Sequence, residues 1–237
     1  MVILGSVVNG IGIIMGTVIG RGFRNIPDKM KETIMYSIGL VVILIGLQMG
    51  IKSQHILVVI LSLVFGAAFG EWWKLEERLN QLGRHLERLL KTKGDTDVAG
   101  AFVNSTLIFV IGAMSILGAL DSGIRGDHSV LYTKAVIDGF TAIVLASTLG
   151  IGVLFSAVPV ILYEGIIAIC AKFIAAIVPG SLMDFFIVEM GATGGIMIVA
   201  IGLNIMGITK IRVANLLPAI PIVAIMVAIF HYGHIQL

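Results

Sequence analysis

Long, continuous apolar runs separated by short polar segments dominate this sequence. Each run approaches the ~20 apolar residues that a helix needs to cross a ~30 Å hydrocarbon core. The runs lack the alternating pattern of barrel strands, so they predict membrane-spanning α-helices. The predicted fold class is therefore all-α, a polytopic membrane bundle of about eight helices. The expected spans are residues 2–20, 33–50, 56–70, 102–120, 135–153, 158–178, 185–206 and 213–230.

The composition agrees with a lipid environment. Hydrophobic residues make up 58% of the chain, charged residues 13%, and the mean hydropathy is +1.06. Soluble domains carry roughly 45–50% apolar and about 25% charged residues. A soluble chain this apolar would lack the polar groups to cover its surface, so we expect the lipid bilayer as a partner and no nucleic acid.

One segment, residues 71–98, has the character of a cytoplasmic amphipathic helix. Its leucines are spaced 4-3-4-3 with charged residues between them, which is a heptad stripe. They are Leu75, Leu79, Leu82, Leu86 and Leu89. Two interpretations stay open: a helix lying on the inner membrane surface, and a two-stranded contact between subunits. The second is compatible with a homodimer.

Lysine and arginine concentrate on alternate connections, and such residues mark the cytoplasmic side. The inner set is Arg21, Arg24, Lys29, Lys31, Lys74, Arg78, Arg84, Arg88, Lys91, Lys93, Lys210 and Arg212. The outer set is Lys52, Arg125 and Lys134, with Lys172 near the outer end of the sixth span. This bias predicts that both termini lie on the outer side of the membrane.

A shift of 102 residues superimposes several glycines and keeps the span boundaries in step. It pairs Gly10 with Gly112, Gly16 with Gly118, and Gly50 with Gly152. Each unit holds an odd number of spans, so the second copy is inverted, a construction found in transporters and also in channels. Within one membrane domain, 1–237, we expect repeat one at 1–70, repeat two at 102–178, and two further spans at 185–230 as a partial third copy.

Acidic residues inside the spans are the strongest candidates for function. An Asp at a helix centre costs about 2.5–3.5 kcal/mol in a membrane, so it needs a partner, a cavity or an ion. Asp138, Glu164 and Glu189 lie within spans, and Asp121 ends the fourth. The three acids within spans outnumber the one basic residue expected in the membrane, Lys172, so the membrane region has an excess of acidic groups. We expect Asp138 and Glu164 to bind or relay a cation; the alternative is protonated or hydrogen-bonded acids that only join helices.

Neutral oxygen donors within the spans suit a hard cation such as sodium. They are Asn9, Gln48, Asn104, Ser115, Ser147, Thr148, Asn204 and Asn215. Each could instead form only a hydrogen bond between two helices, which stabilises a membrane protein by about 0.6 kcal/mol on average. The stretches 150–159 and 215–221, with their glycines and prolines, are expected to free backbone carbonyls at membrane depth.

Several motifs resemble the YqgA/YdfK-like family of bacterial membrane proteins. They are residues 111–127 (IGAMSILGALDSGIRGD), 134–139 (KAVIDG), 163–165 (YEG) and 211–218 (IRVANLLP). The resemblance extends over nearly the whole chain. It implies a multi-pass protein of the bacterial inner membrane and a domain of unknown function, described as a possible sodium channel or pump and linked to biofilm formation. It implies no catalytic residues.

These patterns together predict a transporter or channel for a small cation, sodium or the proton. We expect neither an enzyme nor a bound cofactor, since nucleophile motifs and the phosphate-binding GxxxxGK[ST] loop are absent from the sequence. Two alternatives stay open. One is a transporter of a small organic solute with the same architecture, and the other is a non-transporting scaffold acting through the leucine-striped helix.

Overall fold

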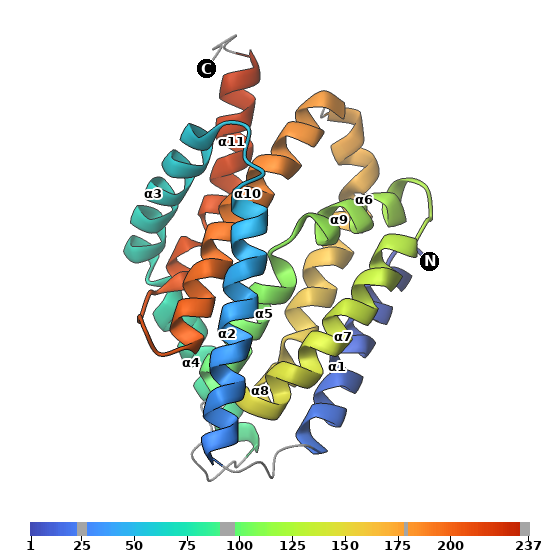
Figure 1. The fold of residues 1–237 in the computed structure, drawn as a ribbon. Coiled ribbons are helices and arrows are strands. Elements are labelled where there is room, and N and C mark those ends of the chain that lie inside the picture. The colour runs from blue at the N-terminus through green and yellow to red at the C-terminus, as the bar shows by residue number, and fades with distance from the viewer. Residues whose placement is uncertain (23–27, 91–97, 178–179, 233–237) are drawn as a thin grey trace. The chain divides into compact units, whose positions relative to one another are not determined.

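The computed structural model describes residues 1–22, 28–90, 98–177 and 180–232. Within these ranges the chain forms helices joined by short turns and loops, with no strands (Figure 1). The α-helices are α1 Leu4–Gly22, α2 Asp28–Gly50, α3 Ile56–Trp73, α4 Leu75–Leu90, α5 Val98–Val110, α6 Ala113–Ile124, α7 Ser129–Leu149, α8 Gly152–Phe155, α9 Ala157–Ile177, α10 Gly180–Ile205 and α11 Ala219–Tyr232, with a 3-10 helix η1 Val213–Leu216 before α11. Within the described residues seven spans are long and apolar enough to cross a membrane, and the bent pair α5–α6 makes an eighth. The predicted all-α polytopic fold is confirmed.

The fourth span differs from its prediction as one straight helix over 102–120. It is broken: α5 ends at Val110, α6 begins at Ala113, and the two are bent by 60°. Gly112 lies in the break, where the low helix propensity of glycine favours an interruption. The helix of the fifth span ends earlier than expected, at Leu149, and the next residue, Gly150, has a φ of 91°, in the region that glycine tolerates.

The contacts divide the chain into two compact units, which we describe separately. Unit 1 comprises Met1–Met35, Arg78–Val110 and Met114–Ala175; unit 2 comprises Tyr36–Glu77, Ile111–Ala113 and Ala176–Leu237. The repeats predicted at 1–70 and 102–178 stay a prediction.

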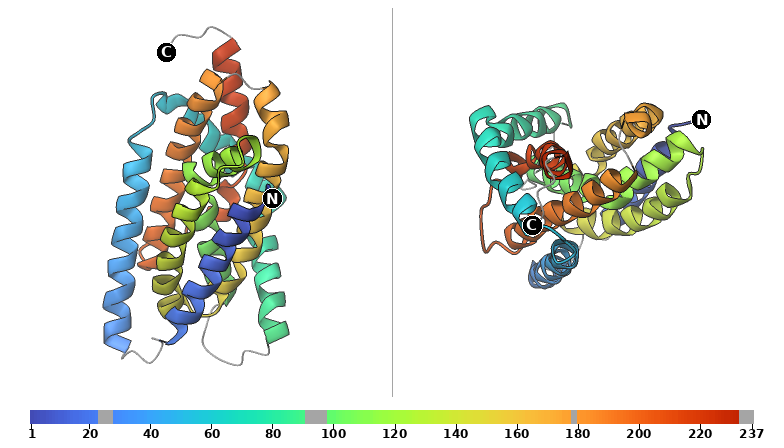
Figure 2. Two further views of the ribbon diagram at one scale, coloured as in Figure 1. Left: turned by 90° about the vertical axis from the view of Figure 1, so that its right-hand side faces the viewer. Right: turned by 90° about the horizontal axis from the view of Figure 1, so that it is seen from above.

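Unit 1 is organised by a close parallel crossing of α1 and α7, which lie side by side in Figures 1 and 2. A β-carbon at Gly12 would lie 2.6 Å from the carbonyl oxygen of Ala135, and one at Gly16 would overlap the carbonyl of Gly139. Gly20 meets the next turn of α7 in the same way. These glycines are spaced four residues apart, so they form one helix face that lets the two backbones touch.

The parallel direction of this pair bears on the number of crossings. If α1, α2 and α3 each cross the membrane, α7 runs parallel to α1 only when one further crossing lies between α3 and α7. The bent pair α5–α6 is the apolar segment at that place. The helix directions therefore favour eight crossings over seven.

Unit 2 is built from antiparallel contacts of the same small-residue kind. Gly46 of α2 packs against Gly195 of α10, and a β-carbon at Gly202 of α10 would lie 2.8 Å from the carbonyl oxygen of Gly39. Helix α3 packs along α11 and η1, where Gly66 meets Ala219 (Figure 2).

The outward face of α9 carries large apolar side chains, as a lipid-facing helix requires. Val158, Leu162, Ile166, Ile169 and Phe173 follow each other at intervals of three or four residues, and all are exposed. On a soluble protein such a continuous patch would favour association, whereas in a bilayer it contacts acyl chains.

Within the segment predicted as an amphipathic helix, residues 71–98, the structure has the helix α4 over Leu75–Leu90, whereas Glu71–Trp73 form the end of α3. The cytoplasmic, amphipathic character of the segment and its leucine stripe stay predictions. Leu75 and Leu79 are half-buried. The side chains of Leu82, Leu86 and Leu89 lie outside the described part of the structure, as do Arg24, Lys91 and Lys93 of the inner basic set.

The α1–α7 crossing yields a stability prediction. Gly16→Ala places a methyl group against the Gly139 carbonyl, and overpacking of this kind costs about 1–3 kcal/mol. We expect a lower thermal unfolding midpoint for the purified protein in detergent. Gly22→Ala is the matched control, because it adds the same methyl to the same helix with nothing within 4 Å. Equal midpoints for the two variants would show that the crossing does not require glycine.

Candidate functional site

Four polar side chains from three helices of unit 1 meet in its interior. Asn9 comes from α1, Lys134 and Asp138 come from α7, and Glu164 comes from α9. Their exposed fractions are 0%, 5%, 7% and 0%, respectively. We call these four residues the buried polar cluster. It brings together three of the residues that the sequence predicts as ion ligands, Asn9, Asp138 and Glu164.

The Lys134 ammonium is the centre of this cluster. Its Nζ pairs with Asp138 Oδ2 and lies 3.5 Å from Glu164 Oε1. Lys134 and Asp138 are four residues apart on α7, so they share one helix face. Asn9 Nδ2 donates a hydrogen bond of 2.9 Å to the same Glu164 Oε1. One oxygen of Glu164 therefore joins α1, α7 and α9.

The broken span adds a backbone ligand. The carbonyl oxygen of Phe109, in the last turn of α5, accepts a hydrogen bond of 2.9 Å from Lys134 Nζ. It also accepts a 3.2 Å hydrogen bond from the buried hydroxyl of Ser115. The last carbonyls of a helix have no partner within it and carry its negative dipole end, so a cation is favoured there. Ser115 and Lys134 thus share the Phe109 carbonyl as acceptor, which connects Ser115 indirectly to the cluster.

The charges of the cluster do not balance. Two carboxyls and one ammonium leave one negative charge when all three are ionised. In addition, Glu164 Oε2 and Asn9 Oδ1 are buried acceptors with no hydrogen-bond partner. An unsatisfied buried acceptor costs about 1–3 kcal/mol. The arrangement can therefore take up one further positive charge, either a proton or a small cation.

The position of Lys134 corrects the sequence-based picture. The charge pattern assigns Lys134 to an outer connection and makes Lys172 the base among the membrane acids. The structure instead buries Lys134 within α7, whereas Lys172 is exposed on α9. The sequence contains an indication of this pairing, since the four-residue spacing between Lys134 and Asp138 places both residues on one face of a helix.

Glu189 is held by a different set of contacts, within unit 2. Its buried carboxylate accepts hydrogen bonds from Ser53 Oγ at 2.7 Å and from the backbone N–H groups of Gln54 and His55 at 2.7 and 3.0 Å. These donors directly precede α3, where unpaired N–H groups favour an acidic partner. The observed contacts make Glu189 a cap for the start of α3.

Asn204 and Asn215 also have hydrogen-bond partners within unit 2. Asn204 Oδ1 accepts from Thr209 Oγ1 and from the Ile211 N–H, which organises the loop after α10. Asn215 Oδ1 accepts from the Glu76 N–H at 2.7 Å, and Glu76 Oε2 accepts from the Ala214 N–H at 2.9 Å. This reciprocal pair fixes the first turn of α4 to η1.

The remaining candidates lie nearer the surface. Asp121 pairs with Arg125 at 3.6 Å, one turn further along. Gln48 is exposed on α2.

Asp127, just before α7, is a further acid at the surface. The backbone N–H of Ser129, the first residue of α7, donates to Asp127 Oδ1 at 2.9 Å, and this hydrogen bond lowers the pKa of the exposed Asp127 carboxyl.

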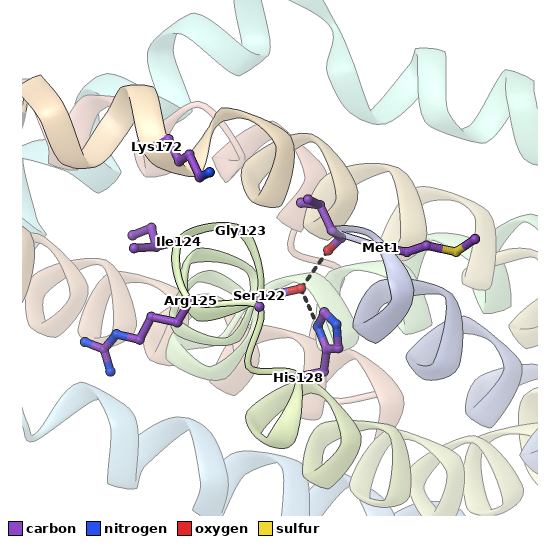
Figure 3. Close-up of a pocket in the computed structure, with 9 residues that line it drawn as sticks. Met1, Ser122, Gly123, Ile124, Arg125, His128 and Lys172 are labelled. Carbon is purple, nitrogen blue, oxygen red and sulfur yellow. Dashed lines mark hydrogen bonds between the residues drawn. The ribbon is translucent and has the colours of Figure 1, made fainter.

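A cavity of about 310 Å³ lies at one end of unit 1, and its lining includes Ser122, Arg125, His128 and Lys172 (Figure 3). The Ser122 hydroxyl donates to the Val2 carbonyl at 2.7 Å and lies 2.8 Å from His128 Nδ1. The charged lining residues are basic, and neither carboxyl of the buried polar cluster lines this cavity. The molecule therefore has a basic cavity and a separate acidic interior.

The sequence matches a known family over nearly its full length. The family described as "Protein of unknown function (DUF554)" matches residues 4–228. The chain belongs to this DUF554 family. The resemblance to YqgA/YdfK-like proteins is thereby confirmed.

Two relatives are similar to this DUF554 protein over more than nine tenths of both chains. The "uncharacterized membrane protein YdfK" of Bacillus subtilis (strain 168) is 30% identical over 232 residues, or 96% of both chains. The "uncharacterized protein YqgA" of Escherichia coli (strain K12) is 27% identical over 223 residues, 92% of this chain and 93% of YqgA. No solved structure matches the chain.

The Glu189 contacts give a prediction for this DUF554 protein. Glu189→Gln directs an NH₂ group toward donors, and each lost charge-assisted bond costs about 1.5–3 kcal/mol. We expect amide hydrogen exchange of Gln54 and His55 to accelerate roughly tenfold or more, since about 1.4 kcal/mol corresponds to tenfold. Glu77→Gln, which affects an exposed pair with Lys74 in the same unit, is the control. Unchanged exchange in Glu189→Gln would contradict the capping role.

Proposed function

We propose that this protein is a membrane transporter for a small monovalent cation, sodium or the proton, and that the buried polar cluster binds it. The observation that carries this proposal is the fully buried Glu164, whose Oε2 has no hydrogen-bond partner; Asn9 Oδ1, on the residue that donates to Glu164 Oε1, has none either. Acceptor oxygens in a site with more acids than bases call for a positively charged ligand.

The chemistry of the surrounding groups suits a hard cation. Asp138 and Glu164 supply negative charge, and Asn9 and the Phe109 carbonyl supply neutral oxygen. Oxygen ligands of these kinds bind hard cations. Broken helices whose free carbonyls coordinate sodium or protons near the membrane midplane are a recurring construction of transporters. The α5–α6 break supplies such a carbonyl here.

The burial of the cluster favours a carrier over an open pore. The four residues are at most 7% exposed, and the cavity lining includes neither carboxyl. A closed site has to open to each side in turn for an ion to pass. We place this carrier in a bacterial cell membrane because its relative YdfK is a bacterial membrane protein, and with both termini outside because of the distribution of Lys and Arg.

A second candidate function is transport of a small anionic solute, and the basic cavity favours it. Arg125, His128 and Lys172 line this cavity. Such groups bind carboxylates or phosphates through charge-assisted hydrogen bonds.

Flux measurements test the cation proposal. Purified protein in liposomes should carry sodium or protons down an imposed gradient. Because a neutral amide at either site removes one negative charge, Glu164→Gln and Asp138→Asn should each lower the flux by roughly tenfold or more, equivalent to about 1.4 kcal/mol. Asp184→Asn is the charge-matched control, since Asp184 is exposed on α10.

The same liposomes separate the alternatives. Normal cation flux in both cluster variants would exclude the cluster as the site. Transport of an anion that is lost in Lys172→Gln, with no cation flux in the unmodified protein, would favour the second candidate.

A further inference from the structure

The basic cavity of unit 1 lies where α6, α9 and the residues before α1 meet (Figure 3). Its volume of about 310 Å³ is at the lower end of the ~300–1,000 Å³ typical of small-ligand sites. Gly123 brings α6 close to α9, because a β-carbon there would overlap the Ala168 carbonyl and the Ala171 side chain. This crossing places Lys172, the residue after Ala171, beside the turn that follows α6.

The charged residues that line the cavity leave it positive. Lys172 is exposed and has no ion-pair partner within the described residues. Arg125 lies 3.6 Å from Asp121, so its charge is partly compensated, and Figure 3 shows its side chain extending away from Ser122. Neither Asp121 nor Asp127 lines the cavity. Lys172 is therefore the main uncompensated charge, and an anion is favoured beside it.

A hydrogen-bonded pair fixes another side of the cavity. The Ser122 hydroxyl is 1% exposed and donates its one hydrogen to the Val2 carbonyl, so its oxygen accepts from His128 Nδ1–H. These bonds hold the imidazole in place. The other ring nitrogen, Nε2, has no hydrogen-bond partner in the part of the chain that the structure describes, and as an N–H it donates to an anion.

The cavity also adjoins the lipid-facing surface of α9. Ile166, Ile169 and Phe173 are exposed along that face, and Lys172 follows Ile169 by three residues, so it lies on the same side of the helix. Ile124 of α6 is 43% exposed and lines the cavity itself. A lysine in such a place keeps its stem on apolar surface and its ammonium at the level of the headgroups.

We propose that this cavity binds the phosphate of an anionic phospholipid, whose acyl chains lie along the exposed face of α9. Lys172 supplies the charge through charge-assisted hydrogen bonds. A soluble phosphate offers the same chemistry, but only a lipid also uses the apolar face beside the lysine. Basic pockets between membrane helices bind lipid headgroups in other proteins. The site is separate from the buried polar cluster, so this inference does not depend on cation transport.

Native mass spectrometry of the purified protein tests this site with defined lipids. The probes are phosphatidylglycerol, phosphatidylcholine with the same acyl chains, and glycerol phosphate, which has the anionic group without acyl chains. We expect phosphatidylglycerol to bind roughly tenfold or more tightly than either of the others, since each lacks one of the two contacts.

Substitutions at Lys172 locate the bound lipid. Lys172→Gln should lower the affinity for phosphatidylglycerol by roughly tenfold or more, because it removes the charge-assisted contact. Lys172→Arg keeps the charge and should retain binding. Lys52→Gln is the matched control, since Lys52 is an exposed lysine in the loop before α3, away from the lining of the cavity.

Three results would overturn the proposal. One is equal affinity of the unmodified protein and Lys172→Gln for phosphatidylglycerol. Another is equal affinity of the unmodified protein for phosphatidylglycerol and phosphatidylcholine. The third is binding of glycerol phosphate as tight as that of the lipid and lost in Lys172→Gln, which would favour the anionic solute of the second candidate function instead.

Discussion

A lysine ammonium enclosed by two carboxylates inside a membrane protein is the interaction on which this structure depends. Removal of one partner from a buried ion pair typically costs about 3–5 kcal/mol, because the other charge is left uncompensated. Here Lys134 joins α7 to α9 through Glu164 and to α5 through the Phe109 carbonyl. These contacts between helices stabilise unit 1 and also bring two carboxylates together. The same atoms therefore contribute to the stability of unit 1 and to the proposed binding of a cation.

The backbone features of unit 1 bring these groups together. Gly12 and Gly16 allow α1 to approach the α7 backbone, and Gly10 packs against Ile161 of α9. Asn9, adjacent to this glycine face, is thereby held against Glu164. The α5–α6 break orients a carbonyl toward Lys134. Small residues and an interrupted helix therefore position the charged groups.

Much of this arrangement could be read from the sequence, and the exceptions have physical reasons. Apolar runs predicted the spans, and the cost of charge in lipid singled out Asp138 and Glu164. Lys134 was misplaced because a lysine near a span end usually extends to the interface. The α5–α6 bend interrupts an unbroken apolar run, with Gly112 as its main cue. The capping contacts of Glu189 join residues more than 130 positions apart, beyond any local pattern.

Infrared difference spectroscopy tests the central claim, that these carboxylates exist to meet a positive charge, most directly. Spectra of the purified protein in lipid are recorded with and without sodium and at low and high pH, and compared with those of Glu164→Gln. The account predicts changes in the carboxyl stretching bands, induced by sodium or by protons, that disappear in Glu164→Gln. Spectra that respond to neither cation, or difference bands that persist in Glu164→Gln, would contradict it.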